Sequence, residues 1–302
     1  MSTVRPPSST PAPAERPGSP APVVRVRVPE RSLGSELRAI RIVWRREIIR
    51  YFSDRLRIVT TLVQPLLFLF VLGSGLQHLS SAGTHGVDLR TFIYPGVLAI
   101  SVLFTAMFSA ASIVWDREFG FLREMLVAPV RRASLVIGKC LGGATVASFQ
   151  GVIVICIAGL VGVPYDPTLV LAVLGIQLLL AFTITAFGVM VSARITQMQS
   201  FMAITQMLLL PLYFLSGAVF PASNLPTWLY VLNRIDPLTY AVDPMRRVVF
   251  AHLHLPAAVQ ARLNPGISWG SWRVPTGLEV GVIALIGVVM LGVAIVRFNH
   301  TD

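Results

Sequence analysis

The chain has 302 residues, of which 54% are hydrophobic and 13% are charged, and its mean hydropathy is +0.72. Charged residues make up about 25% of a typical soluble domain, so this composition excludes an ordinary soluble globular protein. The net charge of +11 does not predict nucleic-acid binding, because no polar stretch is rich enough in basic residues to form a binding face. We therefore expect an all-α membrane protein.

The first 30 residues are rich in proline, serine and alanine and contain few large apolar side chains. Such a segment cannot bury enough surface to offset the entropy lost on ordering, so residues 1–30 are predicted to form a disordered cytoplasmic tail. They lack the apolar core of a cleavable signal peptide. A plain flexible extension is favoured over a recruitment segment.

Residues 31–57 are predicted to contain an amphipathic interfacial helix. Apolar side chains recur at intervals of three and four, and arginines occupy the other faces. Trp44 and Tyr51 suit the boundary between lipid and water, which predicts a helix lying on the membrane surface. The alternative is a soluble helix that packs against a neighbouring domain. The predicted apolar stripe consists of Leu33, Leu37, Ile40, Trp44, Ile48 and Tyr51.

Six apolar runs of roughly 20 residues or more follow, and at 1.5 Å per residue each can cross about 30 Å of hydrocarbon. A backbone in lipid must satisfy its own hydrogen bonds, so these runs are predicted to be helices. The third run is longer than needed and should tilt, or project beyond the lipid at its Gly138–Lys139 end. Within a transmembrane domain of residues 58–298, the predicted spans are 58–79, 91–115, 134–163, 168–193, 199–220 and 277–298.

The basic residues predict the orientation of the spans. Twelve arginines precede the first span, and the connections after the second and fourth spans carry five more. The connection after the first span contains only Arg90, and residues 163–167 contain no basic residue. Because short cytoplasmic loops carry the excess of arginine and lysine, both termini are predicted to be cytoplasmic.

Residues 116–128 form a short charged segment between two apolar runs and are predicted to be a cytoplasmic coupling helix. Asp116 suits a helix start, because its carboxylate can accept unpaired N–H groups of the first turn. Pro129 ends the helix. A solvated loop between helices is the alternative. The apolar side is predicted to consist of Phe119, Phe121, Leu122, Met125 and Leu126, and the charge is supplied by Arg117, Glu118, Arg123 and Glu124.

Residues 221–276 form a long connection on the outer side, before the last span. Apolar pieces of about ten residues are broken there by prolines such as Pro237, and they are too short to cross the membrane. We predict re-entrant or interfacial helices in this outer segment, with Trp228, Tyr230 and Tyr240 at a depth that suits aromatic side chains. Residues 251–275 are predicted to form an irregular exposed loop.

The sequence contains no pattern typical of a catalytic or energy-coupling site. The nearest match to a phosphate-binding loop, around Gly138 and Lys139, lacks the first glycine and the hydroxyl that would hold Mg²⁺. Proton-driven carriers usually keep acidic residues or histidine inside their spans, and here Glu279 lies near the outer end of the sixth span. Cysteine and histidine form no cluster with metal-ligand spacing. No catalytic residue, metal site or bound cofactor is therefore expected in this chain.

Polar uncharged side chains and methionines inside the spans suit a path for bulky, partly apolar cargo. Gln64 lies beside Pro65, where a local kink can form. For any single residue, helix–helix packing by small and hydroxyl side chains is the favoured alternative, and it also suits Gly138, Gly142 and Gly143. The candidate substrate-path residues are Gln64, Ser101, Thr105, Ser109, Met202, Thr205, Gln206 and Met207.

Two stretches together resemble the ABC-2 family of exporter permeases, especially those associated with daunorubicin-type drug resistance and nodulation-factor export. The first, DREFGFLREMLVAP from Asp116 to Pro129, is similar to the family's coupling-helix region. The second, NRIDPLTYAVDPMR from Asn233 to Arg246, is similar to the segment before the family's final span. With the six-span layout and the amphipathic start, the resemblance covers about residues 33–298.

The resemblance implies a dimeric permease, either a homodimer or a pair with a related permease, served by two separate ATP-binding cassette subunits that bind ATP and Mg²⁺. It implies export of a hydrophobic or amphipathic drug, lipid or glycolipid across a bacterial plasma membrane. The charged residues of the coupling helix would pair with the ATPase subunit or clamp the amphipathic helix near Arg45 and Arg46. An ATP-independent secondary carrier of lipophilic compounds is the competing hypothesis.

Overall fold

The computed structural model describes residues 32–75, 88–121, 130–219, 226–253, 256, 259, 263–264, 266–269 and 272–300. These residues belong to one compact unit, Arg31–Asp302, which is distinct from Met1–Glu30. The predicted disordered tail, residues 1–30, lies outside the described residues.

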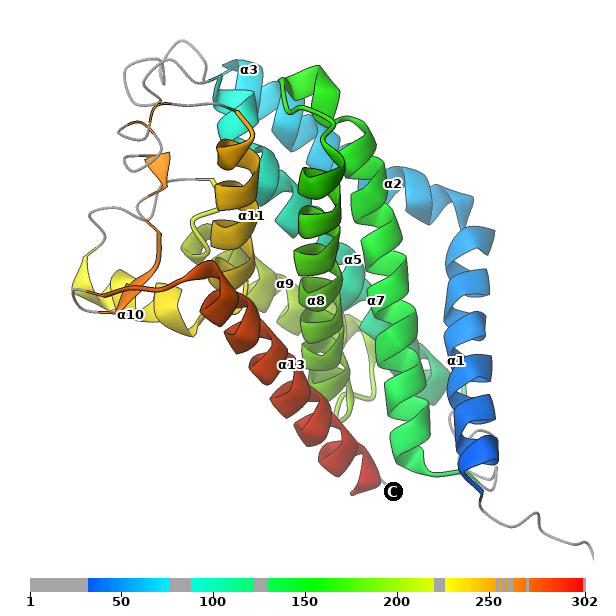
Figure 1. Ribbon diagram of the computed structural model, residues 1–302. Helices are drawn as coiled ribbons and strands as arrows, with labels where there is room; N and C mark the ends of the chain where they lie inside the picture. The colour runs from blue at the N-terminus through cyan, green and yellow to red at the C-terminus, as the bar shows by residue number, and fades with distance from the viewer. Residues whose placement is uncertain are drawn as a thin grey trace, which may run out of the picture. The chain divides into compact units, whose positions relative to one another are not determined.

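Six helical segments are long and apolar enough to cross a membrane, which confirms the predicted number and order of spans (Figure 1). The third predicted span continues past its helix as a 3₁₀ turn, η2 (Ala158–Val161), which ends at Gly162 with φ +76°. The six are α2 (Arg55–Leu67) with η1 (Phe68–Leu72) and α3 (Gly73–Gly75), then α5 (Leu89–Glu118), α7 (Arg132–Cys156), α8 (Pro167–Ser192), α9 (Met198–Leu215) and α13 (Thr276–Asn299).

Helix α5 is the core helix of this unit and packs against α2, α7, α8 and α9. Of its most apolar 18-residue window, 89% is buried, against 22% for α9 and for α13. Small residues allow the close packing: a Cβ added at Gly96 would lie 2.2 Å from the carbonyl oxygen of Ala218. The long, exposed apolar sides of α9 and α13 are the surfaces that lipid or another subunit can cover.

Helix α1 (Leu33–Ser53) confirms the predicted amphipathic helix and packs lengthwise along α7. Gly138 and Gly142 of α7 make this possible, because a Cβ at these positions would come within 2.8 Å of Val43 and 2.7 Å of Glu47. The predicted role of these glycines in close helix contact is therefore confirmed. At the start of the predicted apolar stripe, Leu33 and Leu37 are 84% and 67% exposed, and the placement of this helix on the membrane surface stays a prediction.

The first span is irregular where Gln64 and Pro65 occur. The N–H of Phe68 reaches the carbonyl oxygens of both residues, and the chain continues as the π-helical turn η1. Proline lacks an N–H and disturbs the carbonyl pairing of the preceding turn, which accounts for the change of helix type at this position.

The segment predicted to lie on the outer side contains two short helices, α10 (Thr227–Ile235) and α11 (Thr239–Ala251), which confirms that neither piece is long enough to span. Helix α11 packs against α5, α8 and α13 and is mostly buried, whereas Asn233 is the buried residue of α10. The three aromatic residues predicted for this segment differ in how far they are buried. Trp228 is 65% exposed, Tyr230 is half-buried, and Tyr240 is buried with its hydroxyl donating to the carbonyl oxygen of Arg234 at 2.9 Å.

The prediction of an irregular exposed loop over residues 251–275 is wrong in part. Two short strands, β1 (Ser268–Trp269) and β2 (Trp272–Arg273), pair in antiparallel fashion. Ile267 and Val274 on either side of this strand pair are buried, and the N–H of Val274 donates to the carbonyl oxygen of Ile267 at 2.9 Å. Apolar anchors on both sides of the strand pair hold it against the helices.

Candidate coupling site

The C-terminal ends of α5 and α8 and the N-terminal ends of α7 and α9 meet at one end of the helix bundle, which we call the basal end. Two charged residues in the last turn of α5, Arg117 and Glu118, contact the neighbouring helix ends there. Arg117 donates to the carbonyl oxygens of Ala193 and Ile195 at 2.8 and 2.7 Å, where α8 has ended. Glu118 accepts the N–H of Met198, the first residue of α9, at 3.3 Å. These contacts satisfy helix-end groups that have no partner within their own helices.

A buried ion cluster connects three helices at the basal end. Lys139 of α7 contacts Asp116 of α5 at 2.6 Å and Glu47 of α1 at 2.9 Å. Its ammonium group also donates to the hydroxyl of Ser112 at 2.8 Å. The exposed fraction of each of the three charged side chains is between 4 and 6%. We call Glu47, Asp116 and Lys139, with Arg46 and Arg50, the basal ion cluster.

The two arginines of the basal ion cluster lie on its solvent side. Arg46 forms a short ion pair with Asp116, and Arg50 approaches the other oxygen of Asp116 at 3.6 Å. Three cations therefore face two carboxylates. Buried charges are tolerated only when they are paired, so removing one partner of such a cluster is expected to cost several kcal/mol. The cluster fixes α1 against α5 and α7 at a defined register.

The prediction of a separate coupling helix that begins at Asp116 is wrong for its first three residues. Helix α5 continues through Asp116 and ends at Glu118, and Gly120 follows with φ +81°. Asp116 is buried, so it does not face a partner subunit. Arg117 and Glu118 are engaged with α8 and α9. The expected clamp on the amphipathic helix is real, but Asp116 forms it, with Arg46.

Two of the predicted docking residues do lie on the surface at the basal end. The side chain of Phe119 is 70% exposed and that of Phe121 is 55% exposed. Large exposed aromatic side chains next to a rigid helix end suit burial by another protein. The remaining predicted docking residues, Leu122, Arg123, Glu124, Met125 and Leu126, lie outside the described residues.

The other side of this connection is also anchored. Glu36 of α1 accepts the N–H of Arg131 at 3.1 Å and the hydroxyl of Ser134 at 2.6 Å. Arg132 donates to the carbonyl oxygens of Phe298 and Asn299 at the end of α13. Both helices that the segment 119–131 connects are therefore held by polar contacts at the basal end.

The candidate substrate-path residues divide into two groups. Gln64 and Ser101 are brought together and line a cavity of about 180 Å³ between α2 and α5, with Phe104 and Phe108. Thr105, Ser109 and Thr205 are buried in the helix packing, which is the alternative that the sequence left open. On α9, Met202 is half-buried, and Gln206 and Met207 are exposed.

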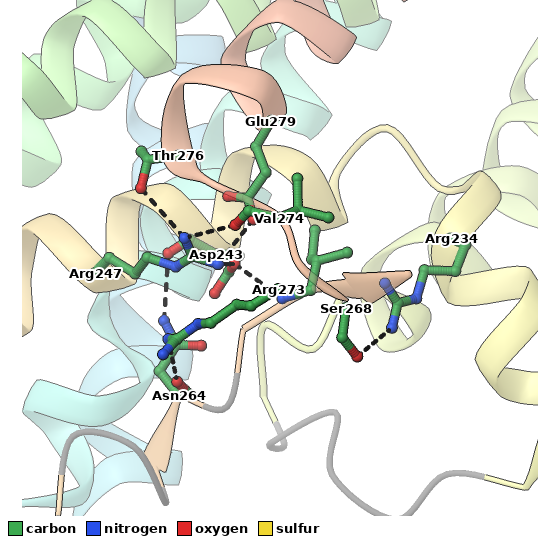
Figure 2. A network of polar contacts seen from close by, with 10 residues as sticks. Arg234, Asp243, Arg247, Asn264, Ser268, Arg273, Val274, Thr276 and Glu279 are labelled. Carbon is green, nitrogen blue, oxygen red and sulfur yellow. Dashed lines mark hydrogen bonds and ion pairs between the residues drawn. The ribbon is translucent and has the colours of Figure 1, made fainter. Parts of the chain in front are cut away.

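A second polar cluster ties α11 to the start of α13. Figure 2 shows its side chains converging on Arg247, which contacts Asp243 at 2.5 Å and Glu279 at 2.8 Å. The same guanidinium donates to the carbonyl oxygen of Val274 at 3.1 Å. Glu279, the acidic residue at the end of the sixth span, is thus the ion-pair partner of Arg247.

The stretch Asn233–Arg246 contacts other parts of the chain through the side chain of Arg246. Arg246 lies over the ring of Phe92, 4.5 Å from its centre, and donates to the carbonyl oxygens of Gly217 and Ala218. Burial lowers the pKa of Arg246 to about 10, so the group stays charged at neutral pH. Burial raises the pKa of Asp236 to about 8. The sequence did not identify Arg246 and Asp236 as structural residues, because sequence alone does not show whether a charged side chain is exposed in a loop or buried in the core.

Comparison with known proteins agrees with this architecture. The sequence model of the family described as ABC-2 type transporter matches residues 38–250. The chain is 29% identical to the putative transport permease ycf38 of Cyanophora paradoxa over 211 residues, 68% of this chain and 72% of the relative. It is 27% identical to nodulation protein J of Rhizobium meliloti (strain 1021) over 260 residues, 84% of this chain and 91% of the relative.

A third relative is a probable multidrug ABC transporter permease, YbhR, of Escherichia coli (strain K12). The identity is 28% over 165 residues, which is 54% of this chain and 44% of the relative. The named relatives are all permeases or nodulation proteins. The residues matched by the family model, 38–250, include the basal ion cluster, α10 and nearly all of α11.

Proposed function

The chain belongs to the ABC-2 type transporter family and is a multi-pass membrane permease, and from this premise we propose that separate ATP-binding cassette subunits dock at its basal end and drive export. One observation carries the proposal. The exposed Phe119 and Phe121 lie directly after α5, the same helix whose last turn holds the basal ion cluster and the α8–α9 connection.

The mechanism follows from how the basal end is built. A partner subunit that binds Phe119 and Phe121 moves the end of α5. Because α5 is closely packed along its length, it does not bend freely and moves as a unit. The basal ion cluster passes that movement to α1 and α7, and Arg117 passes it to α8. Closure of the ATPase subunits, which bind ATP and Mg²⁺, would thereby shift the helices as packed units.

The arginine distribution supports a cytoplasmic basal end. Arg46, Arg50, Arg131 and Arg132 gather there, and short cytoplasmic loops carry the excess of basic residues. Both termini would then lie in the cytoplasm, and the relatives from Escherichia coli and Rhizobium meliloti favour the plasma membrane of a bacterium. Membrane lipids cover the apolar sides of the helices.

A second permease copy, or a related permease, would cover the exposed sides of α2 and α9. Gln64 and Ser101 lie in the cavity beside α2, so a path for cargo between two copies would include them. The cavity walls are mostly apolar, which suits a hydrophobic or amphipathic drug, lipid or glycolipid. The name of one relative, a probable multidrug ABC transporter permease, agrees with a drug as cargo.

The experiment is copurification with the ATPase subunit, followed by assay of ATP hydrolysis in reconstituted vesicles. Phe119→Ala with Phe121→Ala should leave membrane insertion intact and abolish both binding and stimulated hydrolysis. Trp228→Ala is the matched control, because this aromatic side chain is 65% exposed on α10, away from the basal end and from the sides of α2 and α9. Normal transport by the double variant would refute docking at these residues. Cargo flux without any ATPase subunit would instead support a secondary carrier.

A further inference from the structure

An apolar cavity of about 360 Å³ lies between α8, α9, α10 and α13, away from the predicted substrate path. Its walls include Leu212 and Leu215 of α9, Ile235 of α10, and Ile286 and Met290 of α13. The volume falls within the range of about 300–1,000 Å³ that is typical of small-molecule sites.

The cavity is built to hold an apolar occupant. Thr183, one of its two polar side chains, already donates its hydroxyl to the carbonyl oxygen of Ile283 at 3.2 Å. Waters need two to four polar partners, and cavities with apolar walls stay dry and accept apolar ligands. The cavity therefore favours hydrocarbon over water.

The surroundings indicate where such an occupant comes from. Ile235 is 69% exposed and Leu232 is 42% exposed, so the wall formed by α10 is open to the outside of this chain. The neighbouring α9 and α13 are the candidate spans with most of their surface unburied, together with α2. A cavity that opens between spanning helices is reached from the bilayer.

The second polar side chain of the cavity wall is that of Asp236. Asp236 lines the cavity with 5% of its surface exposed, and it accepts hydrogen bonds from the N–H of Leu238 at 2.9 Å and the hydroxyl of Thr239 at 3.3 Å. The ion pairs of the described residues do not include it. Because burial raises its pKa to about 8, the carboxyl is mostly protonated at neutral pH and has an O–H to donate.

We propose that this cavity binds the single hydrocarbon chain of an amphiphile, with the Asp236 carboxyl donating a hydrogen bond to an ester, amide or hydroxyl oxygen at the polar end of that chain. The ligand is either a bilayer lipid or the exported cargo, since the two share this chemistry. Only the second source rests on the proposed export function.

The test is photolabelling of the full-length protein, without ATPase subunits, in nanodiscs that contain a phosphatidylethanolamine with a diazirine in one acyl chain. Ile286→Trp fills the cavity, and Leu285→Trp is the control, because Leu285 is 64% exposed on the same helix and does not line the cavity. Label on the lining residues of α9, α10 and α13 should fall about tenfold in Ile286→Trp, as expected when about two methylene groups lose their burial. Leu285→Trp should keep the label of the unsubstituted protein.

Three further results make the test decisive. If Ile286→Trp does not fold, Leu215→Trp fills the same cavity from α9 and should give the same loss. Equal loss of label in both variants, or label spread evenly along α13, would mean an unspecific lipid coat and overturn the proposal. Crosslinks between two copies of the chain at the lining residues, in place of lipid label, would also overturn it.

A second arm distinguishes the two sources of the ligand. Labelling is repeated in the presence of the ATPase partner with a diazirine-bearing fatty acid as the probe, with and without ATP and Mg²⁺ added before irradiation. Loss of labelling when ATP and Mg²⁺ are present during irradiation identifies exported cargo, and unchanged labelling identifies a resident lipid. Because the first arm uses no ATP, its result stands even if the proposed export function fails.

Discussion

The ammonium group of Lys139 lies 2.6 Å from the carboxylate of Asp116, and this contact joins α7 to α5 inside the helix bundle. Lys139 is the only lysine in the chain. The cation at this position must contact Asp116, Glu47 and the hydroxyl of Ser112 at once, which requires a long side chain with a compact charged group. The ammonium of lysine, on a flexible side chain and with three donors, meets that need better than the planar guanidinium of arginine.

Lys139→Met should destabilise the protein by about 3 kcal/mol. The substitution leaves two buried carboxylates without their central cation, and breaking a buried pair costs about 3–5 kcal/mol; the lower value applies because Arg46 still contacts Asp116. The measurement is the free energy of unfolding in detergent. Arg45→Met, on the exposed face of α1, is the control and should change it by less than about 0.5 kcal/mol. Equal effects of the two substitutions would contradict the role of the basal ion cluster.

Gly142→Ala should separate α1 from α7. The added methyl group would lie 2.7 Å from the Cβ of Glu47, and overpacking of this kind costs about 1–3 kcal/mol. Gly175→Ala in α8 is the matched control, because a Cβ there has no atom within 4 Å and the helix gains about 0.5–1 kcal/mol. Limited proteolysis of α1, measured beside thermal unfolding, should be faster for Gly142→Ala alone. Identical cleavage rates in the two variants would show that the close contact is dispensable.

The spans could be predicted from sequence because their cause is local. A bilayer demands an apolar run of fixed length, and the run is visible wherever it occurs, so α5, α8 and α13 begin and end within three residues of the predicted positions. The π-helical turn after Pro65 has a local cause as well. Helix α10 begins directly after Pro226, and Pro237 separates it from α11. The expected break at Pro244 is wrong, because this proline lies inside α11.

The basal end could not be predicted in the same way. Whether Asp116 starts a new helix or lies in the last turn of α5 depends on Glu47 and Lys139, which are far away in the sequence. A charged residue next to an apolar run is equally consistent with solvent and with a buried partner. One signal was available: the single lysine lies inside an apolar run, where an unpaired charge would be costly.

The stability of the protein should depend on pH through Asp236. The pKa of this carboxyl is raised to about 8 in the folded state, against about 3.9 when unfolded. Between these values the folded state holds a proton that the unfolded state has lost, so the free energy of unfolding falls as pH rises from about 4 to about 8. Asp236→Asn removes this titration.

The measurement is the melting temperature of both proteins in one detergent at pH 5, 6, 7 and 8. Relative to the unsubstituted protein, Asp236→Asn should gain stability steadily over this range. A difference between the two that does not change with pH would mean that the carboxyl is ionised in the folded state.

Arg117→Met should loosen the connection between α8 and α9 without unfolding either helix. The guanidinium holds the carbonyl oxygens of Ala193 and Ile195, and hydrogen bonds to a charged group contribute about 1.5–3 kcal/mol. Loss of these contacts should speed amide hydrogen exchange in residues 193–198 by about tenfold or more, since 1.4 kcal/mol is a factor of ten. Arg194→Met is the control, because Arg194 is exposed in the same connection and should leave exchange unchanged. Faster exchange that extends through the whole of α8 would show that Arg117 stabilises the helix itself. In that case Arg117 would not serve to fix its junction with α9.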